Sequence, residues 1–368
     1  MVVNNDTNIR CAENLMANPA DIIQVLFLTI VMALSLLGNF SILYVILRVR
    51  RLHCPTGFLL VNLAMIDIMM TVTLLPIRIP GILVESRVFN ETSCMIIGYI
   101  QNLLSYACVL TVVAISLDRY LAIVLPLRYK SRVTGSRTTI AITCIWVFSI
   151  LCSCFPFVGF GKYSFIPGLW LCDSIYQTNT GFTYFKLSSS YFVPLIIISY
   201  LYFKIFRVSR HHSKQIRREV EAMNFRENSV SVEVETQVGK INDVSGQFCL
   251  RKPHSALKSE VKTALTLGFV VGALFVSWAP HIVLTVWTSC SAQNNHMVAY
   301  EVSSFMYYLN VMINPYIYGY LNRTIKSQLK KYINNAIDHC SSLCAKTNKV
   351  TPSIIIIGPG EETRTGNF

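Results

Sequence analysis

The stretch Ser116–Lys130 reads SLDRYLAIVLPLRYK and overlaps the end of the uncharged run Cys94–Leu117. About 20 consecutive apolar residues are enough to cross the hydrocarbon core of a bilayer as a helix. Asp118 and Arg119 therefore stand where such a helix would meet water. An acid beside an arginine at this boundary has to be explained by the rest of the chain.

The composition is that of an integral membrane protein. Of the 368 residues, 53% are hydrophobic and only 14% are charged, whereas soluble domains carry roughly a quarter charged residues. Long, non-alternating apolar runs can satisfy their backbone in lipid only as helices. We therefore predict an all-α bundle of seven membrane-spanning helices, near Ile22–Leu47, Phe58–Val84, Ser93–Val124, Thr138–Val158, Thr183–Phe206, Thr263–Trp287 and Val298–Tyr320.

The net charge of +13 is distributed as membrane topology requires, and it does not indicate nucleic-acid binding. Most of the 32 Lys and Arg residues fall in alternate loops and in the C-terminal tail. Basic loops stay in the cytoplasm. The sequence therefore predicts a multi-pass plasma-membrane protein with its N-terminus outside and its C-terminus inside.

The chain divides by composition into a bundle and its polar flanks. The loop 208–259 is basic at both ends and too polar for a core, so we expect it to be largely disordered, with helical extensions at its margins. A basic amphipathic helix that lies on the inner membrane surface is expected after the last span. The predicted segments are an outer tail (1–21), the bundle (22–322, including the loop), the amphipathic helix (323–336) and a cytoplasmic tail (337–368).

Sequons and cysteines on the predicted outer side suggest covalent modification. Asn5 and Asn90 head Asn-X-Thr tripeptides and are glycosylation candidates. Four of the 12 cysteines lie outside, and an even number in an oxidising compartment favours two disulfides. Inside, Cys340 and Cys344 are palmitoylation candidates, with ordinary free thiols as the alternative.

Several polar residues and prolines lie within the predicted spans. Buried acids and amides are costly in a membrane, so they are either functional or form hydrogen-bonded contacts between helices. Proline in a span removes a backbone donor and permits a kink. The residues concerned are Asn39, Asp67, Asn310 and Asn314 together with Pro194, Pro280 and Pro315.

Taken in order, these residues resemble the rhodopsin-like (class A) G-protein-coupled receptors, and the resemblance covers the chain from Ile22 to Ile333. It is most similar to the amine, opsin and melatonin branch and to its orphan members. The matching motifs are Asn39 of GN, Asp67 of NLAMID, Cys94, DRY at Asp118–Tyr120, Trp146, Cys172, Pro194 with Tyr202, WAP at Trp278–Pro280 and NPYIY at Asn314–Tyr318.

The resemblance implies a role for the acid and arginine of the opening stretch. Arg119 would pair at rest with Asp118 and with Glu260 at the foot of the sixth helix. On activation the sixth helix would swing outward, and Arg119 would help to receive a heterotrimeric G protein, with arrestin as a further partner. Tyr202 and Tyr318 would turn inward to hold the open state.

The resemblance also implies a disulfide and an ion site. Cys94 and Cys172 would be bridged, and Cys11 with Cys290 is a candidate second bridge. The family's sodium pocket would use Asp67, Asn39, Asn310 and Asn314. The serine that usually completes it is Cys108 here, a poor ligand for a hard cation, so sodium binding stays open and no other cofactor is expected.

Two ligand classes fit the sequence badly. The aspartate that amine receptors place on the third helix is replaced by Gln101, and the retinal lysine of opsins is replaced by Tyr308. A basic cavity is expected instead, which suits an anionic ligand group; alternatively, Arg78 and Lys186 pair with Glu301 and Asp173 or extend to the interface. The residues expected around the cavity are Arg78, Gln101, Lys186, Ser190, Trp278, His281, Ser304 and Tyr308.

Other functions fit the sequence less well. A channel or transporter would need a continuous charged path or repeated halves, and an intramembrane enzyme would need paired catalytic groups; the spans show none of these patterns. The sequence therefore predicts a non-enzymatic receptor for an unidentified extracellular ligand. A receptor that signals without any ligand remains the alternative.

Overall fold

The structure is a computed structural model of the chain. It describes residues 19–84, 90–166, 170–175, 179–235, 268, 272, 275–284, 286–287, 297–321 and 323–347.

Long apolar helices build the molecule. Among the described residues, five helices are long and apolar enough to cross a membrane. Thirty residues of α3 extend over about 45 Å at the α-helical rise, which exceeds the hydrocarbon thickness. The helices of the bundle are α2 (Pro19–Arg48), α3 (Pro55–Val84), α4 (Glu91–Val124), α6 (Gly135–Cys154), α7 (Thr180–Leu187), α8 (Val193–Glu235) and α10 (Met297–Leu321).

The fifth and sixth spans need separate description. The fifth is composite: α7 passes through a π-helical turn, Ser188–Phe192, into α8. Pro194 lies two residues after this turn and has no N–H to donate to a carbonyl four residues back, which suits a local widening of the helix. The sixth span is described mainly at the apolar helix Phe275–Leu284.

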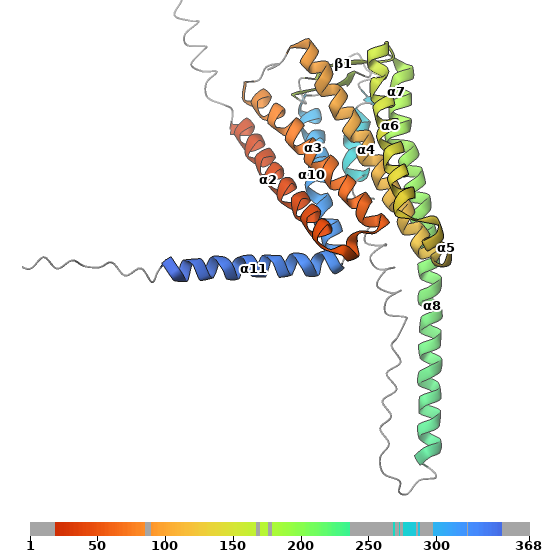
Figure 1. Ribbon diagram of the computed structural model, residues 1–368. Helices are drawn as coiled ribbons and strands as arrows, with labels where there is room; N and C mark the ends of the chain where they lie inside the picture. Colours follow the sequence, from red (N-terminus) through yellow and green to blue (C-terminus); the bar gives the residue numbers. More distant parts are fainter. Residues whose placement is uncertain are drawn as a thin grey trace, which may run out of the picture.

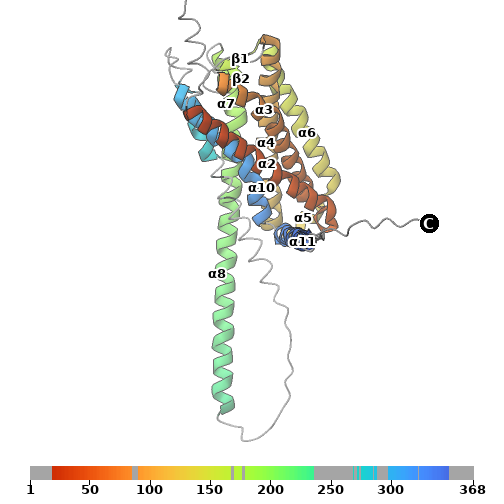
Figure 2. The same ribbon diagram turned by 90° about the vertical axis from the view of Figure 1, so that its left-hand side faces the viewer.

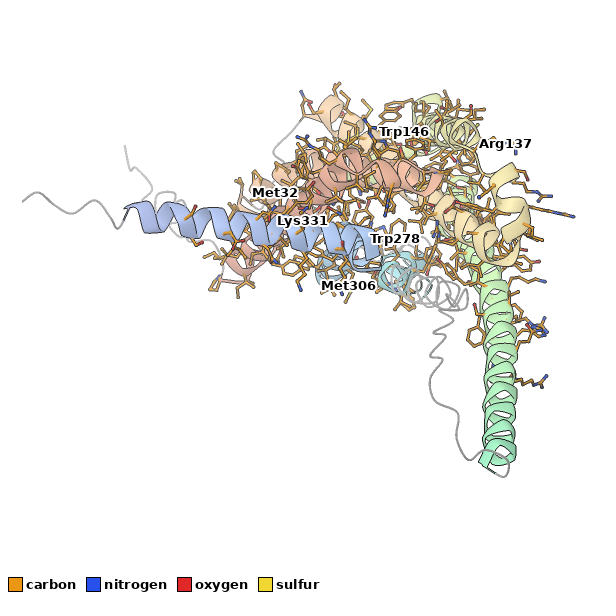
Figure 3. All side chains as sticks on the ribbon, turned by 60° about the horizontal axis from the view of Figure 1, so that its bottom comes forward. Met32, Arg137, Trp146, Trp278, Met306 and Lys331 are labelled. Carbon is orange, nitrogen blue, oxygen red and sulfur yellow. A yellow bond between two sulfur atoms is a disulfide. The ribbon has the colours of Figure 1, made fainter. Side chains whose placement is uncertain are left out.

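The bundle is packed like a membrane protein, with apolar side chains on its outer surface as well as in its core; Figure 3 draws the side chains, with Met32 of α2 and Met306 of α10 among those labelled. Ile23, Leu26 and Leu37 of α2 are 58–66% exposed. Exposed apolar surface on this scale would be unfavourable in water but is what lipid contacts. Figures 1 and 2 show α2, α3, α4 and α10 side by side, with α6 and α8 at the edge.

A hairpin covers one end of the bundle. Strands β1 (Lys162–Ile166) and β2 (Leu171–Ile175) pair antiparallel, with Phe165 opposite Cys172. Cys172 is disulfide-bonded to Cys94 at the start of α4, with a Cα–Cα distance of 5.3 Å. The expected bridge is confirmed. It fixes β2 against α4, and this end of the molecule is called the hairpin end below.

Short helices and the ends of α8 and α11 occupy the opposite end. The short helices at this end are η1 (Arg50–Leu52) and α5 (Pro126–Arg132), whereas η2 (Phe155–Val158) contacts β1 at the hairpin end. In Figure 1, α11 (Arg323–Thr347) runs nearly perpendicular to the bundle, while α8 continues far beyond it. Ile325 of α11 is fully buried, and Tyr332 packs edge-on against Tyr44 of α2.

Two helices extend into the segments that flank the bundle. The segment 208–259 was expected to be largely disordered with helical margins, and α8 continues without a break to Glu235, while residues 236–259 lie outside the described part of the chain. The reason is chemical: neither proline nor glycine interrupts the chain between Pro194 and Gly239. Likewise α11 extends to Thr347, beyond the expected boundary at residue 336, and no proline or glycine interrupts it.

Candidate functional site

A polar cavity opens beneath the hairpin. It encloses about 770 Å³ of space between atoms, including its opening to solvent. Every residue expected around a ligand cavity lies on its wall. The lining comprises Arg78 of α3, Gln101, Asn102, Ser105 and Tyr106 of α4, Leu171 and Asp173 of β2, Lys186 and Leu187 of α7, Ser190, Trp278, His281 and Ile282, and Ser304, Tyr307 and Tyr308 of α10.

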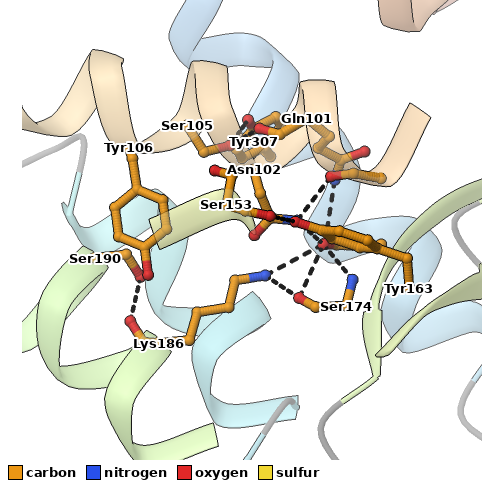
Figure 4. Close-up of polar contacts among 12 residues, drawn as sticks. Gln101, Asn102, Ser105, Tyr106, Ser153, Tyr163, Ser174, Lys186, Ser190 and Tyr307 are labelled. Carbon is orange, nitrogen blue, oxygen red and sulfur yellow. Dashed lines mark hydrogen bonds and ion pairs between the residues drawn. The ribbon is translucent and has the colours of Figure 1, made fainter. Parts of the chain in front are cut away.

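Asp173 is the centre of the cavity's hydrogen-bond network. Its Oδ1 accepts from Asn102 Nδ2 at 2.9 Å and from the Ser174 backbone N–H at 2.6 Å. Its Oδ2 accepts from Gln101 Nε2 at 3.2 Å. Lys186 Nζ lies 3.2 Å from Oδ1 and also donates to Ser174 Oγ. Figure 4 shows Lys186 extending from α7 toward Ser174, with Gln101 and Asn102 on the other side of the network.

The environment of Asp173 favours its charged form. The side chain is almost fully buried, and burial alone would raise the pKa of the carboxyl. The charge of Lys186, the neighbouring His281 and the hydrogen bonds from Ser174 and Asn102 outweigh burial and hold the pKa below its usual value. Asp173 is therefore a carboxylate, and it neutralises Lys186. Of the expected alternatives, the structure shows the Lys186–Asp173 pair.

Arg78 forms a second cationic region beside α10. It is completely buried, and its Nη2 donates to Ser304 Oγ at 2.5 Å. The guanidinium lies 5.5 Å from the ring centre of Phe305 and 5.2 Å from that of Tyr308, within the range of cation–π attraction. The cavity thus has a neutralised pair on one side and an aromatic-stacked arginine on the other.

Below the polar cavity, apolar side chains line a smaller one. It encloses about 470 Å³ by the same measure. Trp278 contributes to both cavities and stacks at 5.5 Å on Tyr307, whose hydroxyl bonds Ser105 Oγ at 2.8 Å. A movement of Trp278 would therefore change the shape of both cavities. Phe275 packs on Tyr191, with the two ring centres 5.6 Å apart.

The four residues of the expected polar core do not converge on one point. Asn314 Nδ2 donates to Asp67 Oδ2 at 3.1 Å, whereas Asn310 Nδ2 donates to Ser277 Oγ at 2.7 Å and Asn39 Nδ2 to the Ser35 carbonyl at 3.0 Å. The core therefore splits into three separate contacts.

This core suits a sodium ion poorly. Asp67 Oδ1 and Asn314 Oδ1 are buried and have no hydrogen-bond donor among the described residues, so two hard oxygens are available. The facing wall of α4 presents Cys108, Val109 and Val112. None of these side chains supplies an oxygen, and a thiol is a soft ligand. The residues present do not complete a sodium site.

At the end opposite the hairpin, Asp118 and Arg119 form a hydrogen-bonded cluster. Arg119 Nη2 and Nε donate to Asp118 Oδ2 at 2.6 and 3.1 Å. Thr56 of α3 donates to the same oxygen at 2.7 Å and also bonds Arg119. Tyr129 of α5 donates to Asp118 Oδ1 at 2.9 Å. Three elements thus meet at one buried carboxylate.

Tyr129 is held in its donor form. Partial burial and then the charge of Asp118 raise the pKa of its phenol to about 12. The phenol therefore keeps its proton throughout the physiological range and continues to donate to Asp118.

The other expected residues are placed as follows. Tyr202 packs with Tyr120 against Ile123 and Ile205, and Asn90 caps α4 by accepting from the Ser93 N–H at 2.8 Å. Pro280 and Pro315 lie within helices. For three residues only the helical backbone is described: Tyr318, Cys340 and Cys344. Four residues lie outside the described part of the chain: Asn5, Cys11, Glu260 and Cys290.

Sequence reasoning missed the helix contacts that Asn62 makes. Asn62 Oδ1 accepts from Trp146 Nε1 at 2.9 Å, and its Nδ2 donates to Thr111 Oγ1 at 2.8 Å. It thereby ties α3 to both α6 and α4. Asn102 was missed as well, and its one signal was that it follows Gln101 on the cavity side of α4. The central position of Asp173 could have been inferred from its place directly after the bridged Cys172.

A family model agrees with this architecture. Residues 38–318 match the model described as "7 transmembrane receptor (rhodopsin family)", which is well over half of the chain. The crystal structure of squid rhodopsin superposes with a TM-score of 0.70 at 20% identity, covering 87% of this chain and 88% of that one. That likeness concerns the fold.

Similar sequences are receptors of several kinds. The chain is 25% identical over 307 residues to the alpha-1A adrenergic receptor of Bos taurus and covers 65% of its length. It is 28% identical to the octopamine receptor beta-2R of Chilo suppressalis, in an alignment that covers 83% of this chain and 78% of that receptor. It is also 28% identical to melanopsin-B of Gadus morhua, in an alignment that covers 83% of this chain and 47% of melanopsin-B. These relatives are receptors and not enzymes.

Proposed function

Because the chain belongs to the rhodopsin family of seven-transmembrane receptors, we propose that it carries an extracellular signal to a heterotrimeric G protein at the plasma membrane. The observation that supports this most directly is the pair of sites at opposite ends of one bundle. A cavity lies under the hairpin, and the Asp118–Arg119 cluster lies at the far end. With the basic loops in the cytoplasm, the hairpin end faces outward.

The Asp118 cluster is suited to a two-state switch. Its carboxylate holds Arg119, Thr56 and Tyr129 together, and these contacts would be exchanged for contacts to a Gα subunit when the sixth helix moves outward. Charge pairs at such boundaries bias helix arrangements without locking them. Arrestin would use the same opened surface. Glu260 is proposed as the sixth-helix partner of Arg119.

The cavity's chemistry narrows the ligand class. An ammonium ligand would have to compete with Lys186 for Asp173, since Gln101 stands at the usual carboxylate position and already donates to Asp173. Retinal has no lysine between Val298 and Tyr320 to attach to. We therefore propose a ligand that presents a carboxylate or another acceptor to the side of the cavity that holds Arg78.

A second-messenger panel (cAMP, calcium and arrestin recruitment) with candidate ligands tests this proposal. Losing a charge-assisted hydrogen bond costs roughly 1.5–3 kcal/mol, so Arg78→Ala should lower agonist potency by about 10-fold or more. Gln101→Ala removes a neutral donor, so its free-energy cost for agonist binding should be about half that of Arg78→Ala. A biogenic amine that activates the receptor strongly and is unaffected by Arg78→Ala would contradict it.

One observation favours the alternative of signalling without a ligand. Asp173 brings a carboxylate from the hairpin into the cavity, where residues of α4 and α7 bind it. The hairpin could thus act as an internal ligand. Basal signalling above that of mock-transfected cells, lost in Asp173→Asn at equal surface expression, would support this alternative.

A further inference from the structure

The polar cavity and the apolar cavity below it meet at a partition of two aromatic side chains. Trp278 of the sixth span and Tyr307 of α10 line both cavities, and their ring centres lie 5.5 Å apart. Of the described residues that line the cavities, only these two belong to both walls. The two cavities are therefore separated by a single layer of rings.

The partition is held by a hydrogen bond on one side only. The Tyr307 hydroxyl and Ser105 Oγ are hydrogen-bonded at 2.8 Å, which ties Tyr307 to α4 (Figure 4). The indole Nε1 of Trp278 is buried and has no hydrogen-bond partner among the described residues. No hydrogen bond of the indole has to be broken to turn it aside. The partition therefore opens most easily at Trp278.

The apolar cavity is suited to hydrocarbon. Its two asparagines use their amide nitrogens within the bundle, Asn310 on Ser277 at 2.7 Å and Asn314 on Asp67 at 3.1 Å. A cavity with mainly apolar walls offers water few partners, and about 470 Å³ lies within the size range of ligand pockets. The apolar residues on its wall include Met70, Val109, Val112, Phe275 and Val311.

A row of rings leads from the cationic side of the polar cavity to the partition. The guanidinium of Arg78 lies 5.2 Å from the ring centre of Tyr308. The ring centres of Tyr308 and Tyr307 are 5.3 Å apart, and Trp278 follows next to Tyr307. All four side chains line the polar cavity. An aromatic track thus joins a cation at one end to an apolar cavity at the other.

We infer that the two cavities together take one amphipathic ligand, a long-chain carboxylate. Its head group lies at Arg78, and its hydrocarbon chain passes Trp278 into the apolar cavity. A carboxylate matches the N–H donors of a guanidinium, whereas Lys186 is already paired with Asp173 at 3.2 Å. Burial of the chain supplies a hydrophobic gain for each methylene. The inference rests on the proposed function and narrows its anionic ligand to one chemical class.

Chain length then decides whether the ligand only binds or also activates. An acid that is too short to reach the partition contacts Arg78 and the polar cavity alone. A longer chain turns Trp278 aside, and Trp278 lies on the span whose movement is proposed to open the G-protein end. Only contacts that differ between the two states can shift the equilibrium between them. The chain makes such contacts, and the head group alone does not.

The test uses the full-length receptor in phosphatidylcholine nanodiscs. Hexanoate, dodecanoate and hexadecanoate are the probes, and saturable binding of each radiolabelled acid is measured against its free aqueous concentration, with empty nanodiscs subtracted. Each methylene that enters the apolar cavity should raise the affinity about 4-fold, so hexadecanoate should bind tightest. Arg78→Gln should lower the affinity for all three acids by about 10-fold.

Val109→Phe tests the position of the chain, because it fills the apolar cavity from α4. It should lower the affinity for hexadecanoate by about 10-fold or more and leave that for hexanoate unchanged. Val113→Phe is the matched control, since Val113 lies one turn further along α4 and lines neither cavity. Val109→Leu adds one methylene; it should give a smaller loss and serves if Val109→Phe does not fold.

Equal affinity for hexanoate and hexadecanoate would overturn the inference and leave the anionic site at Arg78 in place. Equal losses in Val109→Phe and Val113→Phe, or hexadecanol bound as tightly as hexadecanoate, would overturn it as well. Binding of no acid at all would overturn both the inference and the anionic ligand proposed above. Binding in the expected order without nucleotide exchange on an added G protein would support the inference and contradict the proposed function.

Discussion

Asp173 and Lys186 are the residues whose pairing can be measured most directly. Their side chains are only 5% and 11% exposed, so removing one partner leaves a largely buried charge. Such a loss costs about 3–5 kcal/mol, whereas removing both charges costs much less. We expect Lys186→Met to lower the thermal stability of the purified receptor strongly and Lys186→Met with Asp173→Asn to recover most of it.

Lys162→Met provides the control for this cycle. Lys162 lies in β1 of the same hairpin and takes part in no ion pair that the structure shows among its described residues. Its replacement should leave stability within about 0.5 kcal/mol of the wild type. Additive effects of the Lys186 and Asp173 substitutions would show that the two charges do not interact.

The same pair sets a pH dependence. The pKa of Asp173 is lowered in the folded state, so its contribution to stability is present above the unfolded pKa of about 3.9. That contribution is lost only as the pH falls through the lower folded value. Thermal stability should therefore show no Asp173-dependent step between pH 7 and about pH 5. In Lys186→Met the main charge that lowers this pKa is gone, and the acid-induced loss should move to higher pH.

That acid-induced step is checked with Asp173→Asn, which cannot titrate. The difference in melting temperature between wild type and Asp173→Asn should shrink only at the acid end of the range. A difference that disappears near pH 6 would contradict a lowered pKa for Asp173.

At the scale of elements, Gly268 of the sixth span packs closely against Tyr202 of α8. A Cβ built at Gly268 would lie 2.6 Å from Tyr202 Cδ1 and 3.0 Å from Cε1. These distances are shorter than van der Waals contact. Gly268→Ala should therefore push the sixth span away from Tyr202, which is the direction of the proposed activation. We expect basal signalling to rise a few-fold at equal surface expression.

Gly272→Ala is the matched control, since it lies one helical turn further along and a Cβ there would meet nothing within 4 Å. In a helix interior the change from glycine to alanine is otherwise favourable by roughly 1 kcal/mol. A rise in basal signalling in both variants, or in neither, would show that the Tyr202 contact does not restrain the sixth span.

The elements also show how far sequence reasoning reached. Apolar runs of about 20 residues locate spans because lipid leaves the backbone no alternative, and the helices around Asp67 and Trp146 lie where they were expected. The end of α8 was not predicted, since polar composition alone does not distinguish a solvated helix from disorder. Tertiary contacts such as Asn62 with Trp146 have no local sequence signal, because the two residues are on different helices.

At the scale of the whole molecule, the cavity and the Arg119 cluster can communicate only through the helices between them. Trp278 borders both the polar cavity and the apolar cavity below it. Asn314 bonds Asp67 further down, and Tyr202 lies near the Asp118–Arg119 level. Packed side chains with two discrete arrangements can carry coupling over such a distance. The position of the sixth span is the quantity that both ends would bias.

Glu260 is the proposed restraint on that position, and the last prediction concerns it. Exposed ion pairs contribute only about 0–1 kcal/mol, so Glu260→Ala should raise basal signalling no more than a few-fold. Glu219→Ala is the matched control, because it also removes an acidic side chain but does so on α8. If Arg119 is the partner, Glu260→Ala should add little in a receptor that already carries Asp118→Asn, because that substitution loosens Arg119. Fully additive increases in cAMP or calcium would show that Glu260 acts elsewhere.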